Sequence, residues 1–195
     1  MAQRNHYPIT KFIRWLDEAR RFRIPNYEAM ALATAVRGGR TSVRFVLLKG
    51  IDERGFVFFT DARSRKGREL RVNSRASLAL YWQPKGRQVR VEGSVQEVSP
   101  EEADVYWTTR PRQSQLAASA SYQSAQLHSR AELLGRYSRL ARKLRGQEVP
   151  RPSWWTGFRV RPDVLEFWIH REHRLHNREI YRRRGREWRR YLLQP

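Results

Sequence analysis

Along the chain, apolar residues first recur at helical spacing and then alternate with polar residues, as they do in strands. The helical pattern lies in the segment 1–24 and stops before Pro25, and we expect Thr10 to be its N-cap. One face of this predicted helix carries Phe12, Ile13, Leu16 and Ala19. The N-terminal segment is therefore predicted to be an amphipathic helix that packs on a core.

Alternation then predicts a series of strands joined mostly by hairpins. The predicted strands cover residues 29–36, 41–49, 55–60, 76–82, 87–98, 157–160, 164–170 and 179–192. The first two flank Gly38 and Gly39, a dipeptide that suits the positive φ of a tight hairpin. Gly93 indicates a bulge, and the last run breaks into a hairpin near Gly185. Such a meander predicts a closed or nearly closed antiparallel barrel.

Helix signals separate some of these strands. A short helix is predicted over residues 64–72. Ser99 precedes a proline and two acidic residues, so a helix is predicted from there to Thr109. Ser129 and Glu132 form a capping box that opens a further helix.

These elements predict one domain over residues 1–195. Its fold class is mainly β with peripheral helices. Residues 1–24 form the N-terminal helix, residues 99–146 a helical insertion, and residues 155–195 the C-terminal strands.

Composition narrows the chemistry. Cysteine is absent, which excludes a disulfide scaffold, a thiol nucleophile and a thiolate zinc site. No apolar run reaches the roughly 18 residues of a membrane span, so we expect a soluble, cytoplasmic protein. The 40 Lys and Arg against 19 Asp and Glu give a net charge of +21, which favours polyanionic or phosphorylated partners. Many of the arginines are also explained as a solvated surface.

Two cationic clusters lie in the first half of the chain. Arg44 and Lys49 stand at the ends of one apolar strand, on opposite faces. Ser64, Arg65 and Lys66 open a helix directly after a strand, where a hydroxyl, two cations and free N–H groups suit a phosphate. The alternative is that these are ordinary surface cations.

Two further clusters lie in the second half. Tyr106 and Arg110 share a helix face, and Ser114 returns to it after Pro111, so the three donors suit a phosphate. In an extended segment, Arg174 and Arg178 flank His176 and disfavour its protonation, which leaves a neutral imidazole for acid–base chemistry. A cation stacked on an aromatic ring and a solvated basic loop are the alternatives.

A metal site is not expected. His170, His173 and His176 are close in sequence, but they lack a fourth ligand at recognisable spacing and their arginine neighbours oppose a dication. Rossmann, P-loop, serine-hydrolase and zincin motifs are also missing from the sequence.

Taken together, the clusters resemble the pyridoxamine 5′-phosphate oxidase family over nearly the whole chain, from about Trp15 to Pro195. The resemblance rests on the order and spacing of short motifs at residues 29–34, 44–49, 59–60, 64–66, 87–89, 110–115, 123–124, 152–154, 166–168, 174–176 and 193–195. It implies an FMN-binding split β-barrel, antiparallel and Greek-key-like, that forms a homodimer with the cofactor between subunits.

The resemblance also implies residue roles. The cofactor FMN would be bound by Arg44, Val46, Leu47, Leu48, Lys49, Phe59, Thr60, Ser64, Arg65, Lys66, Gln88, Gln123, Ser124, Trp168 and Arg178. The substrate would be bound by Lys49, Tyr106, Arg110, Ser114, Arg174 and His176, of which Arg174 and His176 would be catalytic. The implied reaction is the oxidation of pyridoxamine 5′-phosphate or pyridoxine 5′-phosphate by O₂ to pyridoxal 5′-phosphate, with release of H₂O₂.

Two other functions compete with this one. A related flavin oxidase of the phenazine-pathway type would act on another aromatic metabolite, and it is not expected to keep the substrate-phosphate residues. A non-catalytic barrel that binds nucleic acid or a cofactor would account better for the net charge.

Overall fold

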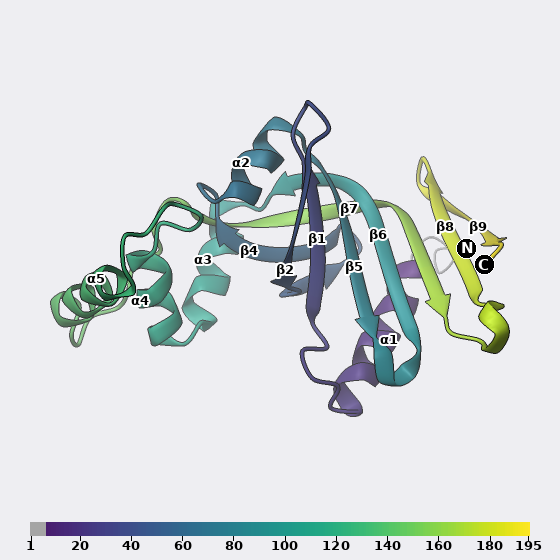
Figure 1. Ribbon diagram of the computed structural model, residues 1–195, viewed down its shortest axis with the longest axis horizontal. Coiled ribbons are helices and arrows are strands. Elements are labelled where there is room, and N and C mark those ends of the chain that lie inside the picture. The colour runs from purple at the N-terminus through teal and green to yellow at the C-terminus, as the bar shows by residue number, and fades with distance from the viewer. Residues whose placement is uncertain (1–6) are drawn as a thin grey trace.

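Nine antiparallel strands form the sheet at the centre of the molecule (Figure 1). The computed structural model describes residues 7–195. The strands are β1 (Ala29–Ala35), β2 (Thr41–Leu47), β3 (Gly50–Asp52), β4 (Gly55–Asp61), β5 (Arg75–Trp82), β6 (Arg87–Glu97), β7 (Trp155–Ile169), β8 (Asn177–Arg184) and β9 (Glu187–Leu193). Their order is β2-β1-β5-β6-β7-β4-β3, and β8 joins β7 to β9.

Strand β7 is the branch point of this sheet. One of its edges pairs with β6, while its other edge pairs first with β4 and then with β8. The sheet curls, and Lys49 N just after β2 donates to Val57 O of β4 at 2.8 Å. The two ends of the main sheet therefore meet, which confirms the predicted mainly β, antiparallel, nearly closed barrel.

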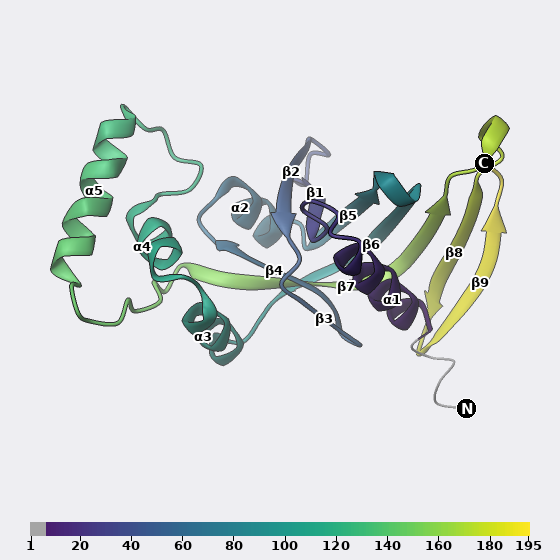
Figure 2. The ribbon, with the colours of Figure 1, turned by 90° about the horizontal axis from the view of Figure 1, so that it is seen from below.

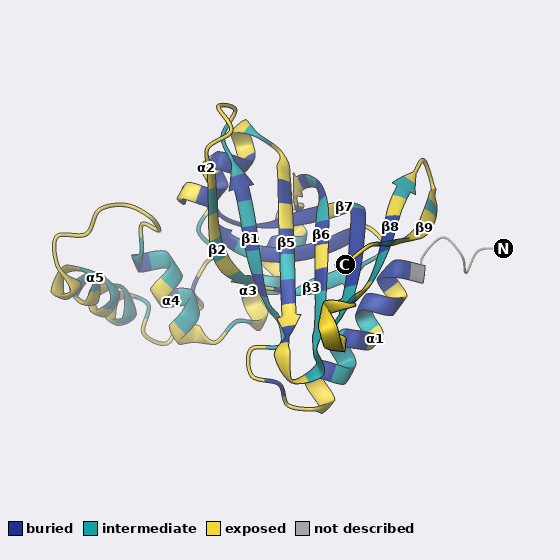
Figure 3. Cartoon of the chain, turned by 45° about the vertical axis from the view of Figure 1, so that its right-hand side comes forward, coloured by how far each residue is buried: buried dark blue, intermediate teal, exposed yellow. Residues whose placement is uncertain are grey.

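The core fills the inside of the curl and is covered by helix α1 (Tyr7–Arg21). Phe12 packs edge-on against Phe56 at 4.8 Å between ring centroids, and Trp15 packs against Phe167 at 5.1 Å. All four side chains are buried, and Figure 3 shows buried positions along α1 and along the strands of the sheet. Burying a phenylalanine stabilises the fold by roughly 1.5–3 kcal/mol, so α1 is an integral part of the core.

The remaining helices lie away from α1. Helix α2 (Arg65–Val72) follows β4, and α3 (Pro100–Thr109), α4 (Arg112–Ala120) and α5 (Arg130–Lys143) form the insertion. Figures 1 and 2 show α3 to α5 at one end of the long axis and the β8–β9 hairpin at the other. Ser64, Ser99 and Ser129 cap their helices as predicted. Within residues 7–195, no helix is long and apolar enough to cross a membrane.

Three details of the sequence prediction were wrong. Helix α1 begins at Tyr7, so Thr10 lies inside it and is not the N-cap; Pro8 suits the first turn, where its missing N–H costs nothing. Strand β3 and helix α4 were not predicted. Residues 1–6 of the predicted helical segment lie outside the described residues.

The third error concerns β7, predicted as two strands with a break around Pro162. The strand runs through, because the register of β6 shifts between Glu92 and Gly93 and Pro162 lies opposite Gly93. A Cβ on Gly93 would stand 2.0 Å from the carbonyl oxygen of Arg161, so only glycine fits there. The bulge predicted at Gly93 is confirmed, and it lets one continuous strand connect both ends of the molecule.

Candidate active site

A cavity of about 810 Å³ opens between the edge of β2, the end of β4 and the insertion helices. Its lining includes Arg44, Phe45, Val46, Leu47, Lys49, Phe59, Thr60, Lys66, Tyr106, Arg110, Ser114, Gln123 and Trp155. Three of the four predicted clusters therefore contribute to one space. Since β2 is an edge strand, residues from both of its faces reach the cavity.

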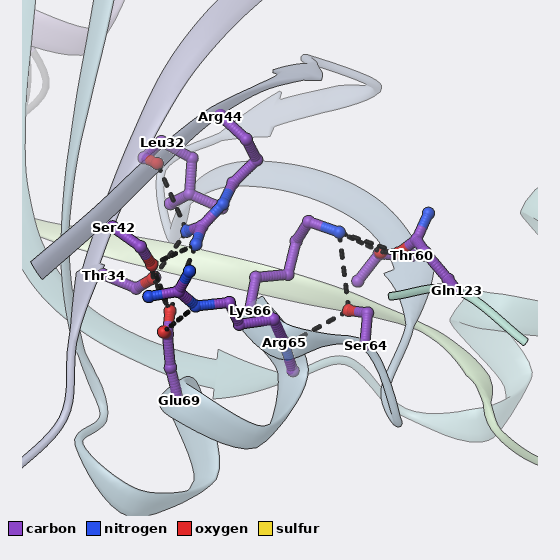
Figure 4. A network of polar contacts seen from close by, with 11 residues as sticks. Leu32, Thr34, Ser42, Arg44, Thr60, Ser64, Arg65, Lys66, Glu69 and Gln123 are labelled. Atoms are coloured by element: carbon purple, nitrogen blue, oxygen red, sulfur yellow. Dashed lines mark hydrogen bonds and ion pairs between the residues drawn. The ribbon is translucent and has the colours of Figure 1, made fainter. Parts of the chain in front are cut away.

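Lys66 forms a buried cationic point on the cavity wall. Its Nζ donates to Gln123 Oε1 at 2.7 Å, to Thr60 Oγ1 at 3.1 Å and to Ser64 Oγ at 3.4 Å (Figure 4). All three acceptors are neutral. Burial, with a smaller contribution from the charge of Arg44, lowers the pKa of Lys66 to about 8. A cation held only by neutral acceptors is suited to bind an anion.

Arg110 is a second cation on the cavity wall. Its guanidinium lies over the ring of Trp155, 4.7 Å from the centroid, and burial lowers the pKa of Arg110. Its Nη1 is buried and has no hydrogen-bond partner in the part of the chain that the structure describes. Buried donors are almost always paired, so this nitrogen marks a place where a ligand acceptor fits.

Aromatic rings stack beside these cations. Tyr106 lies on Phe59 with 4.0 Å between centroids, and Phe59 lies nearly parallel to Trp155 at 5.3 Å. Burial raises the pKa of Tyr106, so its hydroxyl stays protonated and can donate. The cavity thus combines a flat aromatic wall with hydrogen-bond donors.

Lys49 differs from the other cations because it already has a carboxylate. Its Nζ donates to Glu28 Oε2 at 2.8 Å and to Oε1 at 2.9 Å, and both side chains are partly exposed. Part of the charge of Lys49 is therefore balanced within the chain.

Some predicted cofactor residues lie outside the cavity lining. Leu48 is buried in the core, and Ser64 is buried beneath Lys66 as the α2 cap. Arg65 lies next to the cavity, where it pairs with Glu69. Ser124 is exposed, although its neighbour Gln123 lines the cavity.

The fourth cluster forms a second group on the far end of β7. Trp168 pairs in register with Gln88 of β6 and with Arg178 of β8. The ring of His176 lies 4.5 Å from that of Trp168. Arg178 donates through Nε to Glu166 Oε1 at 2.7 Å. None of these side chains lines the cavity described above.

The geometry around His176 differs from the predicted extended segment. Arg174 ends a short 3₁₀ turn (Glu172–Arg174), and both His173 and Arg174 have positive φ, at 53° and 61°. Partial desolvation, then the charges of His170 and Arg174, lower the pKa of His176, while Arg178 is occupied by Glu166. The interpretation that two arginines flank His176 was therefore half right.

The protonation of His176 follows from its contacts. Its Nδ1 accepts the backbone N–H of Arg171 at 3.1 Å. A neutral imidazole in this position carries its proton on Nε2, which then serves as a donor. Within residues 7–195, no group of three or more His, Cys, Asp or Glu side chains is placed to hold a metal ion.

The two groups lie far apart in one chain. Figures 1 and 2 show the α3–α5 end and the turn before β8 at opposite ends of the long axis. One chain therefore presents a cavity with cations and rings beside the insertion helices, and a partly exposed group with Trp168, Arg174 and His176 at the opposite end.

Sequence reasoning missed three residues that shape the cavity: Glu28, Glu69 and Trp155. Glu69 accepts from Arg44 and Arg65, and Glu28 from Lys49. The pairs Glu28–Lys49 and Glu69–Arg44 join residues 21 and 25 positions apart, so no local pattern predicts them, whereas Arg65 and Glu69 stand at the i,i+4 spacing of a helical ion pair. In the sequence, Trp155 only precedes a predicted strand, so no role in the site was predicted for it.

The curled sheet and its cationic, aromatic-lined cavity define the split-barrel class. Residues 16–142 match the family model described as pyridoxamine 5′-phosphate oxidase, and residues 155–195 match the pyridoxine 5′-phosphate oxidase C-terminal dimerisation region. The chain belongs to the pyridoxamine 5′-phosphate oxidase family.

Curated relatives agree with this assignment. The pyridoxine/pyridoxamine 5′-phosphate oxidase of Rubrobacter xylanophilus is 53% identical over 96% of this chain and 87% of its own length. The protein of the same name from Myxococcus xanthus is 48% identical over 96% of this chain and 91% of its own.

Solved structures show the same fold. PhzG from Burkholderia lata 383, in complex with tetrahydrophenazine-1-carboxylic acid, has a TM-score of 0.92 and 39% identity, covering 96% of this chain and 92% of that one. An FMN-binding protein from Nostoc punctiforme, related to pyridoxamine 5′-phosphate oxidase, has a TM-score of 0.78 at 18% identity, covering 95% and 96%.

Proposed function

We propose that the protein oxidises pyridoxamine 5′-phosphate and pyridoxine 5′-phosphate to pyridoxal 5′-phosphate, with FMN as cofactor and O₂ as electron acceptor. The products besides the aldehyde are H₂O₂ and, from the amine and one water, ammonia. The observation that carries the proposal is one cavity lined by Lys49, Tyr106, Arg110 and Ser114. These are the four residues that the family resemblance gives to the substrate phosphate.

The cavity fits a second phosphate group as well. Arg44 of β2 and Lys66 of α2 line it, and Tyr106 and Arg110 line it from the end of α3. Among residues 7–195, the hydrogen-bond partners of Lys66 are all neutral, and Arg110 has a buried nitrogen without a partner. These two cationic groups, with aromatic rings between them, suit two phosphates. Arg44 and Lys66 suit the phosphate of a flavin, and Arg110 suits that of a phosphorylated pyridine.

The residues that would hold FMN come from both groups. The cavity group supplies Arg44, Val46, Leu47, Lys49, Phe59, Thr60, Lys66 and Gln123, with Leu48, Ser64, Arg65 and Ser124 beside it. The other group supplies Gln88, Trp168 and Arg178. When bound, FMN supplies hydride acceptance from the substrate and electron transfer to O₂, chemistry that side chains lack.

The chain's own residues position the substrate. Arg110 and Ser114 bind its phosphate, Tyr106 donates a hydrogen bond, and Phe59 and Trp155 exclude water from one side. Arg174 and His176 cover the substrate ring, and His176 donates from Nε2. Their task is to fix the reacting carbon, since small misplacements reduce the rate of a transfer step strongly.

A second copy of the chain would bring the two groups together. Residues 155–195 match a dimerisation region, and this segment carries Trp168, Arg174 and His176. The edge strand β2 exposes Phe45 by 76% and Val43 by 69%, which is unusual for apolar side chains beside a site and suits a covered surface. We infer a homodimer with two equivalent sites, each built from both subunits.

The phenazine-type alternative has support from the similarity to PhzG. The molecule in that complex has no phosphate group, whereas this chain has all four substrate-phosphate residues around one cavity. This difference favours the phosphorylated substrate. A barrel that only binds nucleic acid would leave the arrangement of Trp168, His170 and His176 unexplained.

The test is oxidation under air by the FMN-loaded protein. Pyridoxamine 5′-phosphate is expected to give aldehyde and H₂O₂ in equal amounts, and pyridoxamine without phosphate is expected to react far more slowly. Equal rates with the two amines would contradict the phosphate assignment. Absence of aldehyde with both would contradict the proposed reaction.

A further inference from the structure

Glu69 is a buried carboxylate behind the cationic wall of the cavity. It lies on α2, one turn after Arg65, and its side chain is only 6% exposed (Figure 4). Four donors surround it, from three different elements. Nothing in the proposed reaction uses this acid directly.

The side chain of Glu69 accepts hydrogen bonds from two cations and from two hydroxyls, and each hydroxyl in turn accepts from a cation. Its Oε2 accepts from Thr34 Oγ1 at 2.5 Å, from Ser42 Oγ at 2.6 Å and from Arg44 Nη2 at 3.1 Å. Its Oε1 accepts from Arg65 Nε at 2.9 Å. Burial opposes the charge, but these hydrogen bonds outweigh it and lower the pKa of Glu69 to about 2.

The hydroxyls connect Glu69 to Arg44 a second time. Arg44 Nη1 donates to Thr34 Oγ1 at 2.5 Å and to Leu32 O at 3.3 Å, and Arg44 Nη2 donates to Ser42 Oγ. Each hydroxyl has a single proton. Because both protons point to Glu69, the oxygen lone pairs of Thr34 and Ser42 face Arg44.

These contacts fix which donors remain for a ligand. The four Nη hydrogens of Arg44 are donated to acceptors within the chain, so its Nε–H and its positive charge remain for a ligand. Arg65 is held through Nε alone, and its Nη groups have no hydrogen-bond partner among residues 7–195. Arg44 lines the cavity and Arg65 lies beside it at the start of α2.

We propose that Glu69 is a positioning residue that holds Arg44 and Arg65 in the arrangement that binds the phosphate of FMN, and that it thereby sets the preference for FMN over riboflavin. This inference rests on the proposed FMN cofactor. Glu69 touches the arginines from behind, and the phosphate would lie on their other side.

An amide cannot replace this carboxylate. A carboxylate accepts on both oxygens, whereas glutamine carries two N–H donors on one side. In Glu69→Gln, that NH₂ group must face either Arg65 Nε or the two hydroxyls. In the first case Arg65 is released. In the second, Arg44 loses the carboxylate oxygen and shares the hydroxyl oxygens with the amide, so that Leu32 O is its one acceptor left unchanged.

Simple electrostatics predicts the opposite effect. Removing a negative charge from beside two arginines makes the site more positive, which would strengthen phosphate binding. Positioning predicts weaker binding despite the added net charge. The sign of the change therefore distinguishes the two roles.

The experiment is a titration of the flavin-free protein with FMN and with riboflavin, followed by quenching of flavin fluorescence. Glu69→Gln is expected to raise the Kd for FMN at least tenfold and to change the Kd for riboflavin less than twofold. Ser42→Ala, a milder change, is expected to raise the Kd for FMN about threefold. This second variant keeps the test valid if Glu69→Gln does not fold.

Glu179→Gln is the matched control. Glu179 is also a shielded acid, with hydrogen bonds from Lys11, Tyr181 and Arg190, but it lies on β8 away from the cavity. Its replacement is expected to lower the melting temperature and to leave the ratio of the two Kd values unchanged. A loss of stability alone would move both Kd values together.

The outcomes separate this proposal from the one on which it rests. If the parent protein prefers FMN and the Glu69 and Ser42 variants keep or increase that preference, the positioning role is overturned and the FMN site stands. If the parent protein binds both flavins equally, the FMN phosphate site is overturned, and the role of Glu69 with it.

Discussion

The two ends of the molecule are built in different ways. In the cavity beside the insertion, cations stack on rings or pair with acids. Arg110 stacks on Trp155, and Arg44 pairs with Glu69. At the hairpin end, Arg174 is exposed and has positive φ, and His176 stands only partly shielded beside Trp168. The cations of the cavity are held by packing and ion pairs, whereas the His176 segment lies nearer to solvent.

This difference indicates that the two groups have different roles, one in binding and one in the reaction. A preformed anion site holds ligands whether or not reaction occurs, and its loss is expected to change binding. The segment around His176 lies at the surface, where another subunit would cover it, and its residues are expected to act on the reacting ring. The separate responses of KM and kcat distinguish these two roles.

The largest effect is expected at the hairpin end. His176→Ala and Arg174→Ala are each expected to lower kcat about 100-fold, the lower part of the range for a positioned acid–base group, with a smaller change in KM. Steady-state kinetics at saturating FMN would measure this. Arg171→Ala is the neighbouring control, because Arg171 contacts His176 only through its backbone. Unchanged turnover in both variants would give this segment a purely structural role.

At the cavity end, Arg110→Ala is expected to raise KM about 10- to 100-fold. A hydrogen bond to a charged group contributes about 1.5–3 kcal/mol, and the phosphate is bound both before and during reaction, so kcat changes less. Arg112→Ala is the control, since Arg112 donates to Gln147 O and Leu144 O outside the cavity. If KM stayed at the parent value, Arg110 would not bind the substrate phosphate.

The pH dependence of FMN binding is expected to report Lys66. A bound phosphate stabilises the protonated amine, so its pKa is higher in the complex than the value of about 8 in the free protein. Binding then takes up a proton, and the affinity is expected to fall about tenfold per pH unit above pH 8. In Lys66→Met the inflection near pH 8 is expected to disappear. An inflection that persists in that variant would assign it to another group.

A smaller effect is expected for Lys49. Because Glu28 already balances part of its charge, Lys49→Ala is expected to raise KM only about three- to tenfold, less than Arg110→Ala. Glu28→Gln, which frees Lys49, is expected to leave KM unchanged or to lower it. A larger loss in Lys49→Ala than in Arg110→Ala would reverse this ranking of the two cations.

The sequence predicted local features well. Period-2 alternation identified most strands, and the caps Ser64, Ser99 and Ser129 are set by neighbouring backbone, so local rules sufficed. The bulge at Gly93 was also predictable. Its effect on β7, which continues through Pro162, was not, because it depends on the pairing of two strands about 70 residues apart.

The candidate site was less predictable because it depends on long-range contacts. The resemblance named the cations, and the structure gathers Arg44, Lys49, Lys66 and Arg110 around one cavity. The acids that hold them, Glu28 and Glu69, follow no motif. The separation of His176 from that cavity in one chain also depends on the length and direction of β7.

Each site is proposed to combine the cavity of one subunit with the His176 segment of the other. The most direct test is a heterodimer of Arg110→Ala and His176→Ala chains, co-expressed with different tags and purified through both. One of its two sites would contain both changes and the other none. At low pyridoxamine 5′-phosphate, this heterodimer is expected to have about half the kcat/KM of the parent dimer. A heterodimer no more active than the average of the two variant homodimers would contradict it.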